Sequence, residues 1–321
     1  MTTSDFLFRG RLRELDPAVA DLCDIEAERQ ARKLILIPSE SSAPAAVLEA
    51  LASRFQNLYA EGYASPETRW QSEEEILDYE KQLGWYRRYS DPRYYKGTEY
   101  ADVAEALARR RCAELFATPQ VPADRLYVNV QPLSGAPANN AVYEALVQPG
   151  DVVMGMSLIH GGHLTHGSPV NRSGKHYRIV PYEVDPETER LNYDRILELA
   201  LEHRPKMIIA GYTSYPWMPD WVRFRDIADA VVAYLLADVS HPAGMIAAGI
   251  VPTPVGYADV ITFTTHKTLC GPRGACVITT NPDWAAAIDR AVFPGEQGGP
   301  HVNVFVAMAV AFKLARTEQF R

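Results

Sequence analysis

The residues from Asp259 to Gly274 read DVITFTTHKTLCGPRG. The stretch opens with an apolar, β-branched run that is typical of a buried strand, and it ends abruptly at Thr-Thr-His266-Lys267. Lys267 therefore follows a predicted buried strand, a position that suits a nucleophilic amine. Such an amine forms a Schiff base with a carbonyl cofactor, of which pyridoxal phosphate is the usual one. The alternative interpretation of Lys267 is a surface lysine.

Predicted strands and helices alternate around this stretch. Strands are expected at residues 126–130, 151–155, 177–181, 206–210, 232–237, 259–263 and 275–280. Helices are expected at residues 16–33, 45–60, 72–83, 99–116, 137–146, 193–203, 222–231 and 304–320. Several of the strands are continuous apolar runs, which favours a mostly parallel, mixed sheet covered by helices on both faces. The sequence therefore predicts an α/β fold with three αβα layers.

The composition argues against several classes of protein. The net charge of −8 over 321 residues disfavours nucleic acid or an anionic membrane as the main partner. Apolar runs are shorter than the roughly 20 residues of a membrane span, and the N-terminal residues show no secretory signal. The four cysteines have neither CxxC nor metal-ligand spacing, which indicates free thiols in a reducing compartment. We expect a cytoplasmic protein without a bound metal.

Polar residues follow four of the predicted strands, where open α/β sheets bind their ligands. They are Ser134-Gly135 after 126–130, Thr213 after 206–210, Asp238 with His241 after 232–237, and His266 with Lys267 after 259–263. Ser134-Gly135 opens a helix whose N-terminus suits a phosphate, and Asp238 suits a pyridine nitrogen. His163, in the glycine-rich loop 161–167, is expected to stack on the ring. The alternatives are a helix cap for Ser134-Gly135, a turn or cap for Asp238 and an ordinary loop histidine for His163.

These residues resemble those of the serine hydroxymethyltransferases, pyridoxal phosphate enzymes of the aspartate aminotransferase fold type, fold type I. The resemblance runs from about residue 20 to residue 321. It rests on Ser39-Glu40, the segment 57–63 (NLYAEGY), Arg93-Tyr-Tyr95, the segment 129–132 (NVQP), Ser134-Gly135 with Ala138-Asn139, loop 161–167, the segment 238–241 (DVSH), the segment 264–274, and the segment 293–300 (FPGEQGGP).

The resemblance implies a role for each cofactor-site residue. Lys267 would carry the pyridoxal phosphate, Asp238 would pair with its ring nitrogen, and His163 would stack on the ring. Thr213 would stand near the phenolic oxygen, with His241 close by. The phosphate would be bound by Ser134 and Gly135 and, from the neighbouring subunit of a homodimer or dimer of dimers, by Tyr59, Gly298 and Gly299.

The resemblance also implies the reaction, the interconversion of serine and glycine with transfer of the hydroxymethyl carbon to tetrahydrofolate. Glu61 would be the acid–base group, and Tyr95 and His266 would belong to the catalytic set. The amino acid and folate would contact a further set, namely Ser39, Glu61, Tyr95, Arg273, Leu158, Gly162 and Leu164.

The chain departs from the family pattern at several points. Ala136 replaces a hydroxyl residue of the phosphate turn, Lys96 and Glu296 replace glycines, and residues 65–92 contain an insertion that is either a surface elaboration or a change to the substrate pocket. We expect an N-terminal arm and helix at 1–44, a cofactor-binding domain at 45–300, and at 301–321 the start of a linker helix to a C-terminal domain that is missing. Because the helical pattern at 304–320 runs to the last residue, we expect a fragment of a longer protein. The family's arginine for the substrate carboxylate lies in that missing domain, so this chain alone is expected to be inactive.

Two other functions stay open at this point. Relatives of this family cleave threonine or perform transaldol reactions without folate, so a folate-independent β-hydroxy-amino-acid aldolase or transaldolase is the first alternative. An inactive cofactor-binding fragment that scaffolds a partner through the exposed end of helix 304–320 is the second.

Overall fold

The computed structural model describes residues 6–89 and 92–321. The chain divides into two compact units, Met1–Glu40 and Ser41–Arg321. The first unit contains α1 (Phe6–Arg9), α2 (Leu12–Leu15) and α3 (Pro17–Arg32). The carboxylate of Asp16 accepts the N–H of Val19, and Pro17 occupies the first turn of α3. This helix therefore begins where its capping residues predict.

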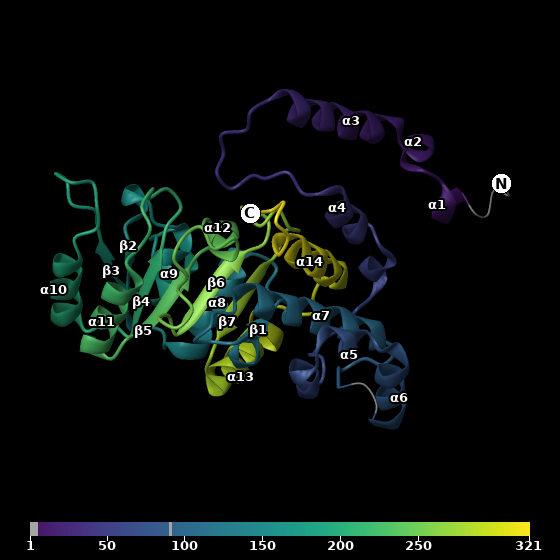
Figure 1. Ribbon diagram of the computed structural model, residues 1–321. Helices are drawn as coiled ribbons and strands as arrows, with labels where there is room; N and C mark the ends of the chain where they lie inside the picture. Colours follow the sequence, from purple (N-terminus) through teal and green to yellow (C-terminus); the bar gives the residue numbers. More distant parts are fainter. Residues whose placement is uncertain (1–5, 90–91) are drawn as a thin grey trace. The chain divides into compact units, whose positions relative to one another are not determined.

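The second unit is built on a seven-stranded sheet in the order β1-β7-β6-β5-β4-β2-β3 (Figure 1). The strands are β1 (Tyr127–Asn129), β2 (Val152–Met156), β3 (Arg178–Tyr182), β4 (Met207–Gly211), β5 (Tyr234–Asp238), β6 (Val260–Thr264) and β7 (Ala275–Thr279). Neighbouring strands are parallel, except that β7 runs antiparallel to both β1 and β6. The carboxyl ends of all strands but β7 therefore meet at one edge of the sheet.

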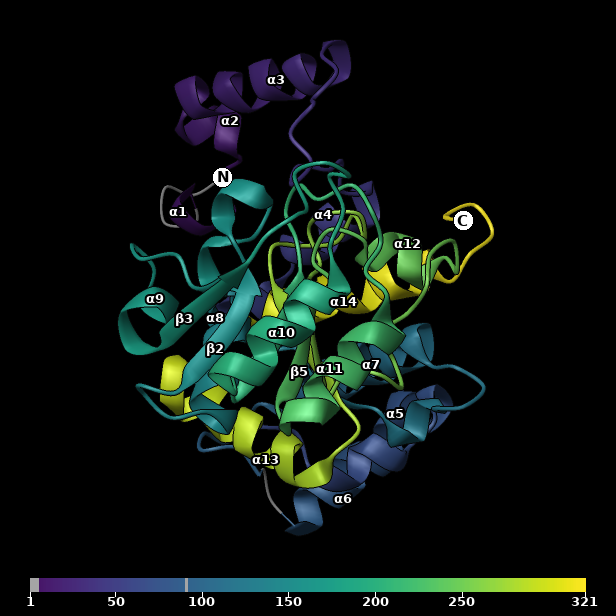
Figure 2. The ribbon, with the colours of Figure 1, turned by 90° about the vertical axis from the view of Figure 1, so that its left-hand side faces the viewer.

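Helices cover both faces of the sheet, which confirms the predicted three-layer α/β fold. Side chains of β4 alternate between two separate apolar clusters: Met207 and Ile209 pack with α8 (Gly135–Leu146) and α13 (Pro282–Arg290), whereas Ile208 and Ala210 pack on the opposite face. The helices of that opposite face are α7 (Glu99–Phe116), α10 (Tyr193–His203) and α11 (Trp221–Val231), and Figure 2 views the molecule from the side of α10 and α11. Strands buried on both faces need apolar residues at every position, which explains the continuous apolar runs.

Three of the predicted helices end earlier or break. The helix expected at 45–60 is α4 (Ala45–Leu51) followed by a short 3-10 turn at Arg54–Asn57, because the amide of Asn303 binds the carbonyl oxygen of Leu51. The segment expected at 72–83 forms α5 (Glu73–Leu77) and α6 (Tyr79–Tyr89), separated by Asp78, whose carboxylate accepts the N–H of Lys81. Five helices of the described residues were not predicted from the periodicity: α1, α2, α9 (Arg172–His176), α12 (Ala243–Ala247) and α13.

The last helix corrects the prediction for residues 304–320. It is α14 (Val302–Ala315), and the hydroxyl of Thr317 caps it by donating to the carbonyl of Leu314. The helix is largely buried and packs against α4 and α7, so it does not run as an exposed rod to the final residue. Within the described residues, we find no helix with the length and apolarity required to cross a membrane.

Residues 65–89, which lie in the segment predicted to contain an insertion, pack on α7. Ile76 of α5 is buried there, and the guanidinium of Arg111 on α7 binds Glu73, with an Nη2–Oε1 distance of 2.5 Å. Tyr79 of α6 meets Tyr100 of α7 edge to face, at 6.2 Å between ring centroids. These contacts describe an elaboration of the helical layer.

Candidate active site

A cavity of about 240 Å³ opens at the carboxyl ends of β4, β5 and β6. Nine of the sequence-predicted site residues line it: Ser134, Gly135, His163, Thr213, Asp238, His241, His266, Lys267 and Arg273. It is also lined by residues that the sequence argument did not propose as site residues, namely Leu133, Ala136, His166, Tyr212, Ser240 and Thr264. None of the described residues 65–89 lines this cavity.

Lys267 lies in the loop after β6, half-buried in the wall of the cavity. Its ammonium donates to the hydroxyl of Thr264, at an Nζ–Oγ1 distance of 3.0 Å. Burial lowers the pKa of Lys267, the carboxylate of Asp238 works in the opposite direction, and the nearby Arg273 lowers it further. A lowered pKa increases the share of neutral amine, which is the nucleophilic form. The alternative of an ordinary surface lysine does not fit this environment.

Asp238 is the last residue of β5 and is 7% exposed. Its Oδ1 accepts the N–H and the hydroxyl of Ser240, and its Oδ2 accepts the Asn139 amide at 2.9 Å and His166 Nε2 at 3.0 Å. Burial alone would raise the pKa of Asp238, but the bonds from His166, Ser240 and Asn139 hold it well below the usual range. The carboxylate is therefore charged, and each of its two oxygens accepts two hydrogen bonds, which is about the capacity of a carboxylate.

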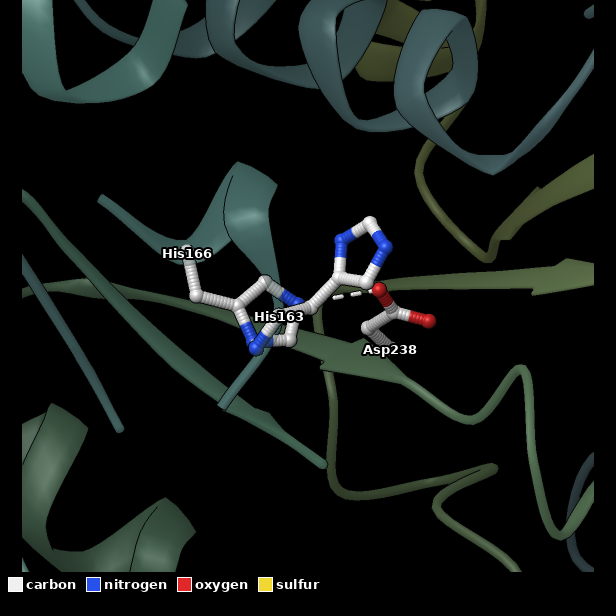
Figure 3. Close-up of side chains that lie close together, drawn as sticks. All are labelled: His163, His166 and Asp238. Atoms are coloured by element: carbon white, nitrogen blue, oxygen red, sulfur yellow. Dashed lines mark hydrogen bonds and ion pairs between the residues drawn. The ribbon is translucent and has the colours of Figure 1, made fainter. Parts of the chain in front are cut away.

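His163 and His166 face Asp238 from the loop after β2, as Figure 3 shows. Nδ1 of His166 accepts the backbone N–H of His163 at 3.2 Å, so its proton resides on Nε2, which donates to Asp238. Nδ1 of His163 contacts the backbone N–H and the hydroxyl of Thr165. Burial lowers the pKa of His163 and favours its neutral form. These hydrogen bonds account for the grouping of two imidazoles and one carboxylate, a grouping that would also have the spacing of metal ligands.

The turn at Ser134-Gly135 begins α8 at the wall of the cavity. Ser134 is the N-cap residue of α8, and its carbonyl accepts the N–H of Ala138, but its side chain makes no capping hydrogen bond to the helix. The backbone passes very close to β6: a Cβ on Gly135 would stand 3.0 Å from Cγ2 of Thr264. The first N–H groups of α8 and the Ser134 hydroxyl are donors of the kind that bind an anion at a helix N-terminus, and Ala136 has only its backbone to contribute there.

Three further residues, Thr213, His241 and His266, line the same cavity. Thr213 donates its hydroxyl to the carbonyl of Gly162 at 2.8 Å, which ties the end of β4 to the loop after β2. Burial, reinforced by the charge of Lys267, lowers the pKa of His241 and of His266 to about 4 each. Both imidazoles are therefore neutral near pH 7, and His266 accepts the N–H of Gly274 through Nδ1.

Five of the predicted residues form a second group, here called the outer cluster: Tyr59, Glu61, Tyr95, Gly298 and Gly299. Tyr59 donates to Oε1 of Glu61 at 3.2 Å, and its ring meets Tyr95 edge to face at 5.7 Å between centroids. A Cβ on Gly299 would stand 3.1 Å from Cζ of Tyr59, so only a glycine fits there without displacing the ring. The charge of Glu61 raises the pKa of Tyr95. The outer cluster does not line the cavity, and Tyr59 and Tyr95 are 61% and 49% exposed.

Leu158, Gly162 and Leu164 are not among the residues that line the cavity. Leu158 and Leu164, in the loop after β2, are 46% and 45% exposed, and Gly162 is buried beneath them. Ser39 belongs to the N-terminal unit and lies within a turn that is closed by the N–H of Glu40 and the carbonyl of Ile37. Their roles toward amino acid and folate stay predictions.

His166, Asn139 and Ser240 are the functional residues that sequence reasoning passed over. Each carried a signal in the segments already quoted: His166 lies three residues after His163 in the glycine-rich loop, and Ser240 lies two residues after Asp238, the spacing of an Asx turn. Asn139 lies one turn into α8, on the face toward β6, where its Oδ1 accepts the hydroxyl of Thr262.

The cavity thus combines a helix terminus for an anion, a half-buried amine and a charged carboxylate on its floor. This set fits a phosphorylated pyridine aldehyde, since each chemical group of such a molecule has a counterpart in the wall. A comparison with known families agrees with this fit: a family model described as Serine hydroxymethyltransferase matches residues 12–90 and 86–321. The two matched stretches overlap where α6 ends, inside the segment predicted to hold the insertion.

Proposed function

Since the chain belongs to the serine hydroxymethyltransferase family, we propose that it interconverts serine and glycine and passes the hydroxymethyl carbon to tetrahydrofolate, with pyridoxal phosphate on Lys267. One observation carries the proposal. The amine of Lys267, the carboxylate of Asp238 and the Ser134-Gly135 turn, which come from three separate strand ends, line one cavity.

Pyridoxal phosphate, when bound, supplies a ring that withdraws electrons from the substrate carbon. Lys267 would hold the aldehyde end, and Ser134 with the first N–H groups of α8 would hold the phosphate. Asp238 would hold a proton on the ring nitrogen. Because Ser240 and His166 already donate to this carboxylate, the ring nitrogen would take the place of one donor, and we propose that the Ser240 hydroxyl yields. His163 would cover the ring face, kept neutral by its buried position.

Glu61 would hold the proton of the substrate hydroxyl during transfer of the one-carbon unit. Its Oε1 lies next to the hydroxyl of Tyr59, and Tyr95 borders the same carboxylate. Tyr59, Tyr95 and Gly298 of the outer cluster are exposed on the chain that carries them, which supports a homodimer in which Tyr59, Gly298 and Gly299 serve the neighbouring cavity. We also retain residues 45–300 as the cofactor-binding domain, and the cytoplasm as the location, supported by four free cysteines.

The test of the cofactor site compares Lys267→Ala with Lys206→Ala. Lys206 is exposed and precedes β4, at the opposite edge of the sheet, so it is a matched control. After incubation with pyridoxal phosphate and gel filtration, the wild type and the control should retain the absorbance of the bound cofactor, and Lys267→Ala should lose it. A wild type that retains no cofactor contradicts the proposal.

The test of the reaction measures serine cleavage by the full-length protein, with and without tetrahydrofolate, and every kcat below refers to the full-length protein. The hydroxymethyltransferase should depend on tetrahydrofolate for serine turnover. Threonine cleavage that is indifferent to tetrahydrofolate would instead support the aldolase, and cofactor retention without turnover of either amino acid would support the inactive scaffold.

A further inference from the structure

The backbone around Glu61 is held from behind by a buried arginine. Nη1 of Arg93 donates to the carbonyl oxygens of Ala60 and Gly62, at 2.9 Å each, and the side chain of Arg93 is fully buried. The N–H of Tyr94 donates to the carbonyl of Glu61 at 3.0 Å. Three consecutive carbonyls, with that of Glu61 in the middle, are thus bound by two consecutive residues, which fixes the direction in which the Glu61 side chain leaves the backbone.

Arg93 is itself anchored in α7. Its Nε donates to Asp102 at 2.6 Å, and its Nη2 donates to Glu105, whose side chain is also fully buried. Burying two charged groups costs free energy that their attraction only partly returns, so a buried pair is weak evidence for a role in stability alone. The planar guanidinium of Arg93 binds carboxylates of α7 and, at the same time, the two backbone carbonyls beside Glu61. The single ammonium of a lysine cannot reproduce this geometry.

Two glutamines extend this network to the cavity. The Gln131 amide donates to the carbonyl of Gly62 at 2.8 Å and to Glu105 at 3.1 Å. The Gln297 amide then donates to the backbone carbonyl of Gln131 at 2.8 Å and accepts the N–H of Leu133 at 3.3 Å. Leu133 directly precedes Ser134, and Gln297 directly precedes Gly298. Gln131 and Gln297, here called the Gln131–Gln297 bridge, therefore link the Ser134-Gly135 turn of the cavity with two segments of the outer cluster. One segment contains Glu61, and the other contains Gly298 and Gly299.

We propose that Arg93 is a positioning residue for Glu61, and that the Gln131–Gln297 bridge sets the outer cluster relative to the Ser134 turn. The inference rests on the proposed role of Glu61 as the acid–base group. Arg93 does not touch substrate or cofactor in this arrangement, and it acts through the carbonyls on either side of Glu61.

The variant Arg93→Lys tests this, with Arg111→Lys as the control. Arg111 lies on α7, is 6% exposed, binds the carboxylate of Glu73 and donates to the carbonyl of Ala309, so it has the same kind of environment without contact to the Glu61 segment. Arg93→Lys should lower kcat for hydroxymethyl transfer by about 10- to 100-fold, the effect of a misplaced reacting group, with unchanged retention of pyridoxal phosphate. Arg111→Lys should retain the wild-type kcat.

A double-mutant cycle separates positioning from general damage. If Arg93 acts through Glu61, then Arg93→Lys should cause no further loss in a Glu61→Gln background. Losses that multiply would overturn the inference, as would equal losses in Arg93→Lys and Arg111→Lys. If Glu61→Gln by itself leaves turnover unchanged, the proposed function of Glu61 fails, a result distinct from failure of the Arg93 argument.

A second readout needs no activity. Hydrogen exchange in the cofactor-free protein should accelerate at the amide of Tyr94 in Arg93→Lys, while the amides of β5 and β6 stay protected. Unchanged exchange at Tyr94 contradicts the inference. If Arg93→Lys does not fold, Gln131→Met removes the amide donor to Gly62 and should give the same pattern of exchange with a smaller loss of kcat, whereas unchanged exchange and kcat in Gln131→Met would overturn the proposed bridge.

Discussion

The cavity around Lys267 and the outer cluster around Glu61 are built in different ways. Asp238 in the cavity is 7% exposed and binds donors from α8, from the loop after β2 and from its own turn. Tyr59 in the outer cluster is 61% exposed and contacts only loop residues in the interactions described above. In the cavity, the buried Asp238 accepts hydrogen bonds from several elements of the fold. In the outer cluster, the exposed Tyr59 has contacts to loop residues on one side.

The difference shows which part of the site the sheet holds in place and which part depends on other contacts. The cavity draws its order from the sheet, because parallel strand ends and the N-terminus of α8 are rigid. The outer cluster draws its order from the buried Arg93 and its partners, and it presents its other side outward. We therefore expect substitutions in the outer cluster to affect chemistry more than cofactor binding or folding.

The largest expected effect is that of Glu61→Gln. If this variant also alters the cavity, the cavity and the outer cluster are not built independently. Loss of an acid–base group should lower hydroxymethyl transfer by about 10²- to 10⁴-fold. The affinity for pyridoxal phosphate, measured by equilibrium titration of its absorbance, should stay within about twofold of the wild type, because Glu61 does not line the cavity. A parallel fall in cofactor affinity would mean that the two regions are not separable.

Asp238→Asn should mainly damage the cavity. A neutral amide turns the charge-assisted bonds from His166 and Ser240, each worth about 1.5–3 kcal/mol, into neutral bonds worth about 0.5–1.5 kcal/mol each. We expect the free energy of unfolding to fall by about 2–3 kcal/mol in urea titrations. Glu61→Asn, as the matched change in the outer cluster, should leave the urea midpoint nearly unchanged, and an equal shift in both variants would contradict the contrast in order between the two regions.

Ala136→Ser should strengthen the cavity where it departs from its family. The residue lines the cavity at the start of α8, so a hydroxyl there would add one hydrogen bond to the phosphate. A bond to a charged group is worth about 1.5 kcal/mol at its lower limit, equivalent to roughly tenfold tighter binding. Titration with pyridoxal phosphate measures the gain, and pyridoxal without phosphate is the control ligand, for which no gain is expected.

A further prediction concerns a pH dependence of stability that arises in the cavity. His241 and His266 have pKa values of about 4 in the folded protein, below the ordinary value of 6.5. As the pH falls, the unfolded chain therefore takes up protons on these imidazoles before the folded protein does. Their contribution to the stability of the folded protein is fully present above pH 6.5 and decreases as the pH falls to about 4. The double variant His241→Gln/His266→Gln should flatten the urea midpoint across this window, and an unchanged slope would contradict the assignment.

The sequence predicted the cavity better than the outer cluster for a physical reason. All seven strands lie within a few residues of their predicted positions, because buried parallel strands require apolar runs. Residues after the carboxyl ends of such strands must share one edge, so the joint exposure of Asp238 and Lys267 to one cavity followed from strand positions alone. The ends of helices were less predictable: α4 ends at Leu51 because Asn303, which is 252 residues away, binds its last carbonyl.

The sequence by itself therefore determined the α/β layers, the order of polar groups along the strand ends and the membership of a family whose motifs are local. Only the tertiary structure decided that the Ser134 hydroxyl makes no capping bond to α8, that His166 and Asn139 donate to Asp238, and that Arg93 binds the carbonyls beside Glu61. The reason is that strand and helix patterns arise from neighbouring residues, whereas each of these contacts joins segments that only the packing of helices against the sheet brings within hydrogen-bond distance.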